Sequence, residues 1–142
     1  GLAELGAEVA VAVGGVALSP DAGPCFRVPA PGEVMAQGRK LVGSAQVRLG
    51  SSLLQHGSIM LAGDQSLLAT LGDGVEDTAP PATLLSLIGE IDGDDLAEAL
   101  TRGLKLALGG DWSNGEYRSG EIAEADWLEK ERYTSDEWTW SK

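Results

Sequence analysis

The stretch EVMAQGRKLVGSAQVRLGSSLLQHGSIML, residues 33–61, decides the fold of this chain. Apolar residues alternate along much of it, and turn-forming residues divide it, which is typical of short β-strands. Gly38 makes the first turn, and the segment GSS at 50–52 makes the second. Strands joined by such short turns pair in antiparallel order, so the stretch predicts an antiparallel meander. The three strands are expected at 33–37, 39–49 and 53–61.

The flanking segments predict one further strand before the meander and mostly helices after it. AEVAVAV, residues 7–13, alternates valine with small residues and predicts a strand. WSNGEYR, residues 112–118, indicates another strand or a hairpin. The expected helices are 64–72 with Asp64 as N-cap, 83–89, 94–108, and one that starts near Ser119 and runs to Tyr133.

The helix at 94–108 has the clearest pattern. Leucines recur every four residues at 96, 100, 104 and 108, with Ala107 beside them, so one stripe of this helix is expected to be buried. Asp94 or Asp95 is the expected N-cap.

Strands therefore precede helices along the chain. This order favours an α+β fold with a mostly antiparallel or mixed sheet and helices on one face. The 142 residues have the length of one domain, in which 1–62 are mainly strands and 63–142 mainly helices.

Composition excludes several classes of protein. Apolar residues make up 43% and charged residues 23% of the chain, which is typical of a globular domain. The net charge of −12 argues against nucleic acid and anionic membrane surfaces as partners. A single Cys excludes an internal disulfide and fits a reducing cytoplasm. One Cys and one His cannot form a zinc site without carboxylates, so no metal site is expected.

The only cysteine, Cys25, lies in the Gly- and Pro-rich segment GPCFRVPAPGEVMAQGRK. A lone Cys is often a small buried apolar residue. However, its flanks are loop-like, and Lys40, one of only four lysines, follows fifteen positions later. A nearby cation stabilises a thiolate and makes it a good nucleophile. Both interpretations of Cys25, buried residue and nucleophile, stay open on composition alone.

Lys40 follows Arg39 directly, so in a regular strand their side chains point to opposite faces and one of them can enter a site. Surface charges are the plainer interpretation of this pair. Small residues after Lys40, at Gly43 and Ser44, would let a ligand approach the backbone. His56 sits among apolar strand residues, which is more often structural than catalytic, although Gly57 again leaves room for a ligand.

These residues also follow an ordered pattern. The chain resembles the lipoate–protein ligase A and octanoyltransferase family, whose catalytic fold is that of biotin and lipoate protein ligases, and most of all its cysteine-dependent octanoyltransferases. The matching positions run in register without a gap: Cys25–Phe26, Pro29, Glu33, Gly38–Lys40, Gly43–Gln46, Arg48 and Gln55–Ser58. The ending ERYTSDEW also resembles the family's C-terminus.

The resemblance implies an octanoyltransferase mechanism. Cys25 would take an octanoyl group from acyl carrier protein as a thioester, and Lys40 would favour the thiolate and contact the acyl carbonyl. The acceptor would be a lysine of a lipoyl domain, as in the glycine-cleavage H protein or an E2 subunit of a 2-oxoacid dehydrogenase. Substrate-binding residues implied by the resemblance are Arg39, Gly43, Ser44, Ala45, Gln46, His56, Gly57 and Ser58.

Two alternatives remain. An ATP-dependent lipoate–protein ligase would need ATP and Mg²⁺, whereas the transferase needs no cofactor. In the other alternative the chain is one subunit of a split ligase, because the family's N-terminal half, with its Arg-Arg and Thr-Gly-Gly-Gly segment, has no match here. The chain then represents the C-terminal half of the catalytic domain, and a further chain could supply the rest.

Overall fold

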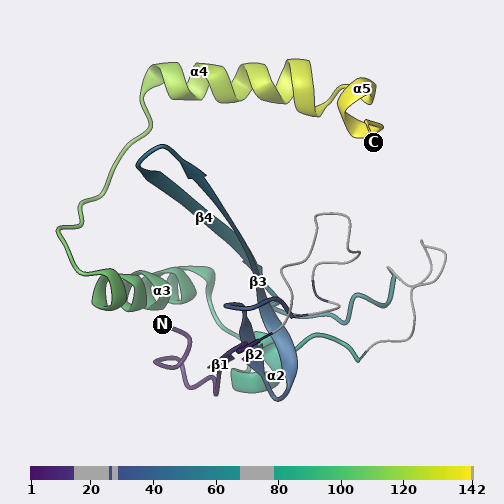
Figure 1. Ribbon diagram of the computed structural model, residues 1–142, viewed down its shortest axis with the longest axis vertical. Coiled ribbons are helices and arrows are strands. Elements are labelled where there is room, and N and C mark those ends of the chain that lie inside the picture. Colours follow the sequence, from purple (N-terminus) through teal and green to yellow (C-terminus); the bar gives the residue numbers. More distant parts are fainter. Residues whose placement is uncertain (15–25, 27–28, 68–78, 142) are drawn as a thin grey trace. The chain divides into compact units, whose positions relative to one another are not determined.

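The computed structural model describes residues 1–14, 26, 29–67 and 79–141 (Figure 1). They form two compact units, Gly1–Gly109 and Gly110–Lys142.

The first unit contains a four-stranded antiparallel sheet with the strand order β1-β2-β3-β4. The strands are β1 (Ala10–Val11), β2 (Val34–Ala36), β3 (Arg39–Leu49) and β4 (Ser52–Ile59). The predicted antiparallel meander is therefore confirmed. The strand expected at 7–13 is reduced to two residues, which pair with the equally short β2. By contrast, β3 and β4 form a long hairpin that extends beyond the other strands (Figure 1).

The turn between β2 and β3 consists of Gln37 and Gly38, both with positive φ, at 51° and 72°. Two positive φ values are typical of the tight hairpin turn whose twist matches that of the flanking strands. Glycine adopts this conformation without a steric penalty, which explains the turn predicted at Gly38.

Two helices of the first unit follow the sheet along the chain. Helix α2 (Leu84–Ile88) begins after Thr83, whose hydroxyl accepts from the N–H of Ser86, and ends at Gly89. Helix α3 (Gly93–Leu108) is capped by Asp92, which accepts from the N–H of Asp94 at 2.8 Å. The predicted cap at Asp94 or Asp95 is thus wrong. These two carboxylates lie in the first turn, where the helix dipole still favours them.

The predicted leucine stripe of α3 is buried only in its first two turns. Ala99 is fully buried, and Leu96 and Leu100 pack against the core. Leu104 and Leu108 are 51% and 71% exposed, so periodicity alone overstated the buried length. The core cluster comprises Leu2, Ala7, Ala36, Leu41, Ala82 and Leu84.

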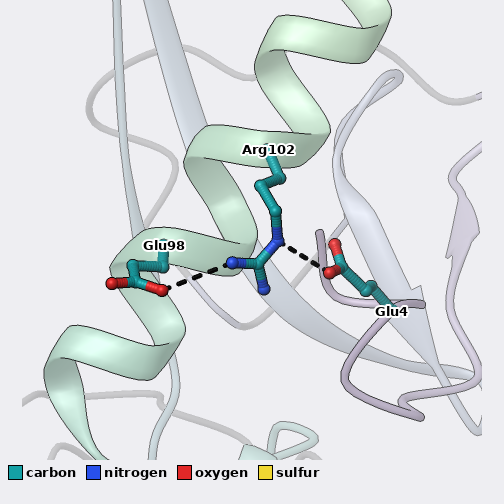
Figure 2. Close-up of polar contacts among 3 residues, drawn as sticks. All are labelled: Glu4, Glu98 and Arg102. Carbon is teal, nitrogen blue, oxygen red and sulfur yellow. Dashed lines mark hydrogen bonds and ion pairs between the residues drawn. The ribbon is translucent and has the colours of Figure 1, made fainter.

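The N-terminal turn is tied to α3 by an exposed ion-pair network (Figure 2). The guanidinium of Arg102 lies between two carboxylates, 2.7 Å from Glu4 and 3.4 Å from Glu98. Because all three side chains are about half exposed or more, water screens the pairs and they contribute little to stability.

The second unit is helical. It contains α4 (Ser119–Leu128), the π-helical turn η1 (Glu129–Tyr133) and α5 (Asp136–Thr139). The helix expected from Ser119 is confirmed, with its last five residues π-helical. The strand or hairpin expected at 112–118 is wrong, since these residues adopt no regular structure. The Cζ atom of Arg132 lies 4.3 Å from the centre of the Trp138 ring, and this contact links η1 to α5.

The helix expected at 64–72 is only partly described. Asp64 accepts from the N–H of Ser66 at 2.9 Å, where the chain turns helical, and residues 68–72 lie outside the described ranges. Among the described residues, every helix falls short of the length and apolar character needed to cross a bilayer.

Candidate active site

Lys40 is buried and paired. It is the second residue of β3, and its ammonium lies 2.7 Å from Oε2 of Glu33, the residue just before β2. Only 4% of the Lys40 side chain and 7% of the Glu33 side chain are exposed. Interpreting Lys40 as an ordinary surface charge is therefore wrong, because the turn between β2 and β3 brings it against a carboxylate inside the fold.

The Glu33 carboxylate also binds two backbone N–H groups. Its Oε2 accepts from the N–H of Ala30 at 2.6 Å, and its Oε1 accepts from the N–H of Ser44 at 3.2 Å. One side chain thus joins the loop before β2 to two positions of β3.

These contacts determine the charge state of Glu33. Burial raises its pKa, but the hydrogen bond from Lys40, the N–H groups of Ala30 and Ser44, and the charge of Lys40 together outweigh burial. The pKa of Glu33 is consequently held below its ordinary value of 4.5. The site therefore contains a carboxylate and, beside it, a lysine ammonium.

A β-bulge places Lys40 on the face of the sheet opposite the core. Val34 pairs with Val42, whereas Met35 pairs with Lys40, so Leu41 is an extra residue in β3. A bulge of this kind reverses the alternation of side chains on its far side. Leu41 and Val42 both pack into the core, and Lys40 shares the opposite face with Gly43.

Gly43 provides the surface against which the Lys40 side chain lies. A Cβ at Gly43 would be 3.3 Å from Cε and 3.5 Å from Nζ of Lys40. The group that approaches Gly43 closely in the structure is thus the Lys40 side chain.

The hairpin distributes the predicted substrate-binding residues over its two faces. Gly43 pairs with Ser58 and Ala45 with His56, and alternation puts these four on the face of Lys40. The other face carries the pairs Ser44–Gly57 and Gln46–Gln55, in which Gln46 donates a side-chain hydrogen bond to Gln55. Residues 44–58 are all exposed, so His56 is not a buried structural histidine.

Arg39 does not join this group. Its guanidinium donates to the side-chain oxygen of Gln37 at 3.1 Å on the exposed turn. The structure thus brings together Lys40, Gly43, Ala45, His56 and Ser58 on one face, and places Ser44, Gln46 and Gly57 on the other.

Cys25 lies outside the described residues. Its neighbour in the sequence, Phe26, is described and buried, and the ammonium of Lys40 lies 5.5 Å from the centre of the Phe26 ring. A cation at this distance is attracted by the ring.

Sequence reasoning missed the roles of Glu33 and Phe26. Both stand in the motif pattern, but the pattern by itself assigned a role to neither. A lone carboxylate flanking a strand of the meander, seven positions before Lys40, was the available hint.

The predicted site residues lie apart from the open groove of the first unit. An open groove runs between the N-terminal turn and β2, lined among others by Ala7, Ala10 and Met35, and none of the predicted site residues line it. In the part of the chain that the structure describes, no three His, Cys, Asp or Glu side chains gather as a metal ion would require.

The lowered pKa of Glu33 predicts an acid-sensitive contribution to stability. A carboxyl with a depressed folded-state pKa stabilises the fold above its unfolded value and loses that contribution as pH falls through the folded pKa. Urea unfolding between pH 7 and pH 3 is expected to show a smaller acid-induced loss for Glu33→Gln than for the unmodified chain. Glu98→Gln, an exposed control, should keep the original slope, and equal slopes for all three proteins would contradict the prediction.

Gly57 is expected to tolerate no side chain. A Cβ there would be 2.5 Å from the carbonyl oxygen of Gly43 and 3.3 Å from Cβ of Ser44, so the hairpin would have to deform. Gly57→Ala should cost roughly 1–3 kcal/mol of unfolding free energy. Gly93→Ala, where a Cβ meets nothing within 4 Å, is the matched control. A Gly57→Ala protein with the urea midpoint of this control would refute the close-approach argument.

The chain is similar to known proteins over most of its length. No family model matches the chain. It is 36% identical over 135 residues to the octanoyltransferase LipM of Kyrpidia tusciae, a match that covers 87% of this chain and 49% of that protein. It is also 51% identical over 63 residues to the octanoyltransferase LipM of Moorella thermoacetica, covering 43% of this chain and 23% of that protein.

The fold has a solved counterpart. A structure described as a lipoate protein ligase from T. acidophilum with bound lipoic acid matches with a TM-score of 0.68 at 21% identity, covering 96% of this chain and 52% of that one. The α+β fold of biotin and lipoate ligases is thereby confirmed. The chain spans about half the length of the curated relatives it matches. In its ordered motifs, its identity to LipM proteins and its fold, the chain resembles about half of a protein of the lipoate–protein ligase and octanoyltransferase family.

Proposed function

We propose that the chain carries the cysteine–lysine half of an octanoyltransferase active site, which moves an octanoyl group from acyl carrier protein to a lipoyl-domain lysine. The observation that carries the proposal is the position of Lys40. Its ammonium is buried, and it lies beside Phe26, the residue that directly follows Cys25 in the sequence. The relatives named octanoyltransferase support the same reaction class.

The proposed reaction has two steps. The Cys25 thiolate attacks the thioester carbonyl of the octanoyl carrier, a new thioester forms on Cys25, and the carrier leaves as its thiolate. The acceptor lysine, as the neutral amine, then attacks this thioester. An amide forms, Cys25 leaves as a thiolate, and the proton lost by the amine passes to solvent.

Lys40 has an electrostatic role in both steps. Its ammonium favours the thiolate form of Cys25 and the negative charge that develops on the acyl oxygen. The small residues of the same face, Gly43, Ala45 and Ser58, leave room beside it for an acyl chain. His56 stands opposite Ala45 on this face and can contact the acyl group or the incoming lysine.

The acceptor is proposed to be a lipoyl domain such as the glycine-cleavage H protein or an E2 subunit. Acyl carrier proteins and lipoyl domains are usually acidic, and this chain has a net charge of −12. Docking therefore requires a local basic surface, for which Arg39 and Arg48 of β3 are the candidates. A reactive thiol also fits a reducing cytoplasm as the compartment.

The ligase alternative assigns the residues differently. An ATP-dependent lipoate–protein ligase would keep Lys40 essential for contact with the acyl adenylate and leave Cys25 dispensable. The fold shared with the T. acidophilum structure is compatible with this activity. Formation of lipoyl adenylate from lipoate, ATP and Mg²⁺ by the unmodified chain would favour the ligase.

Trapping the acyl-enzyme tests the proposal. The full chain is incubated with octanoyl-acyl carrier protein, quenched in acid and digested for mass spectrometry. We expect one octanoyl group on the peptide that contains Cys25, removable by hydroxylamine, and its transfer to added H protein. Octanoylation of H protein without any acylated Cys25 peptide under rapid quench would overturn the thioester mechanism. If the chain acylates neither itself nor H protein, the alternative of one subunit of a split enzyme, without activity alone, is favoured.

A further inference from the structure

We propose that Glu33 is a positioning residue of this active site, whose carboxylate holds the ammonium of Lys40 in place over Gly43. The inference rests on the proposed function, because it concerns the lysine that serves the thioester chemistry. Glu33 itself would not touch the substrate.

Several groups surround the ammonium of Lys40 and restrict its position. Oε2 of Glu33 lies 2.7 Å from Nζ of Lys40, and the Phe26 ring centre lies 5.5 Å from it. Gly43 closes the space beneath, where an added Cβ would be 3.5 Å from Nζ. A lysine side chain has four rotatable bonds and loses considerable freedom when it is held, so a specific anchor is needed to fix its end.

Backbone hydrogen bonds fix the Glu33 carboxylate in addition to its contact with Lys40. The N–H groups of Ala30 and Ser44 bind its two oxygens separately, at 2.6 and 3.2 Å, so the carboxylate plane is set by the backbone. Ser44 belongs to the same strand as Lys40, and Ala30 lies four positions before the start of β2. A displacement of Glu33 would therefore move the ammonium of Lys40 relative to both of these backbone positions.

The contrast with Arg102 shows that this pair is more than a chance surface contact. The Arg102 network has the same 2.7 Å approach, but its side chains are about half exposed or more and free to reorient in water. The Glu33–Lys40 pair is almost entirely removed from water, which is unfavourable for each ion unless both charges are well compensated. The carboxylate meets this condition with three donors.

Position matters because electrostatic stabilisation requires charges that are already in place when the transition state forms. A misplacement on the order of 1 Å can cost about 10²-fold in rate. Without Glu33, the ammonium of Lys40 is expected to be held less precisely over Gly43.

The test is a double-mutant cycle for octanoyl transfer with Glu33→Gln, Lys40→Met and the double variant. We expect Glu33→Gln to lower kcat about 10- to 100-fold while the KM for octanoyl-acyl carrier protein changes little. In the Lys40→Met background the same substitution should change kcat less than about 2-fold, since the residue that it positions is gone. Losses that multiply would show that Glu33 acts independently of Lys40 and would overturn the proposal.

A second readout does not depend on transfer. The rate of alkylation of Cys25 by iodoacetamide, followed by mass spectrometry from pH 5 to pH 9, is expected to shift to higher pH in Glu33→Gln and in Lys40→Met. Glu33→Asp keeps the charge with a shorter reach, so its kcat should lie between those of Glu33→Gln and the unmodified chain. Glu33→Asp also provides the test if Glu33→Gln does not fold. Glu98→Gln is the matched control, because the Glu98 side chain is exposed and its ion pair is with Arg102.

The outcomes separate this inference from the proposed function. Suppose that Glu33→Asp and Glu33→Gln have the same alkylation profile and the same kcat as the control. This result would overturn the positioning role even if Cys25 is the nucleophile. Conversely, a shifted alkylation profile in a chain that transfers no octanoyl group would support the positioning role while the proposed function fails.

Discussion

Replacing Cys25 with alanine is expected to abolish octanoyl transfer, with a fall in rate of at least about 10³-fold. The thioester step needs a sulfur nucleophile, and an alanine offers no atom that can carry the acyl group. Transfer from octanoyl-acyl carrier protein to H protein, measured by the mass of the H protein, gives the rate. The remaining rate should equal that of the uncatalysed aminolysis.

Cys25→Ser provides the matched variant. A serine hydroxyl at this position is a far weaker nucleophile than a thiolate, because Lys40 alone cannot deprotonate it at neutral pH. We expect Cys25→Ser to be as inactive as Cys25→Ala in turnover. Transfer at the original rate by Cys25→Ala would refute the thioester mechanism, and ATP-dependent lipoylation by this variant would establish the ligase alternative.

Lys40→Met should damage both activity and stability. It removes the buried ammonium and leaves the Glu33 carboxylate buried with only backbone donors, and breaking such a pair costs about 3–5 kcal/mol. Transfer should fall by roughly 10²- to 10³-fold, which is the size of the loss when one preorganised donor at a developing negative charge is removed. Urea unfolding and the transfer rate measure the two effects separately.

Lys105→Met is the control for this substitution. Lys105 lies in the last turn of α3 and is exposed, so its replacement should change the unfolding free energy by less than about 0.5 kcal/mol and leave transfer unchanged. The double variant Glu33→Gln with Lys40→Met should regain most of the lost stability, because neither charge is then buried alone. A Lys40→Met protein as stable and as active as Lys105→Met would contradict both expectations.

Local patterns predicted the meander well. β3 has the predicted bounds of 39–49, and β4 begins within one residue of its predicted start at 53. Alternating apolar residues and turn glycines act over a few neighbouring residues. They therefore predict strands and turns without knowledge of the rest of the fold. The cap of α2 at Thr83 and its end at Gly89 follow from equally local chemistry.

Longer-range features were predicted less well. The leucine stripe of α3 indicated burial at Leu104 and Leu108, but burial depends on what lies opposite, and only Leu96 and Leu100 meet the core. The strand or hairpin expected over residues 112–118 would also have required a partner with free backbone groups. Neither requirement can be read from the segment alone.

For the site, the sequence by itself determined the ordered motif, the family that it indicates, and the candidates Cys25 and Lys40. Only the tertiary structure decided that Lys40 is buried, that it shares a face with Gly43, and that Glu33 is its counter-ion. The reason is the extra residue at Leu41, which reverses the side-chain alternation of β3 between Lys40 and Gly43. Strand periodicity carries no signal for such a bulge, because it is set by the pairing of β3 with β2.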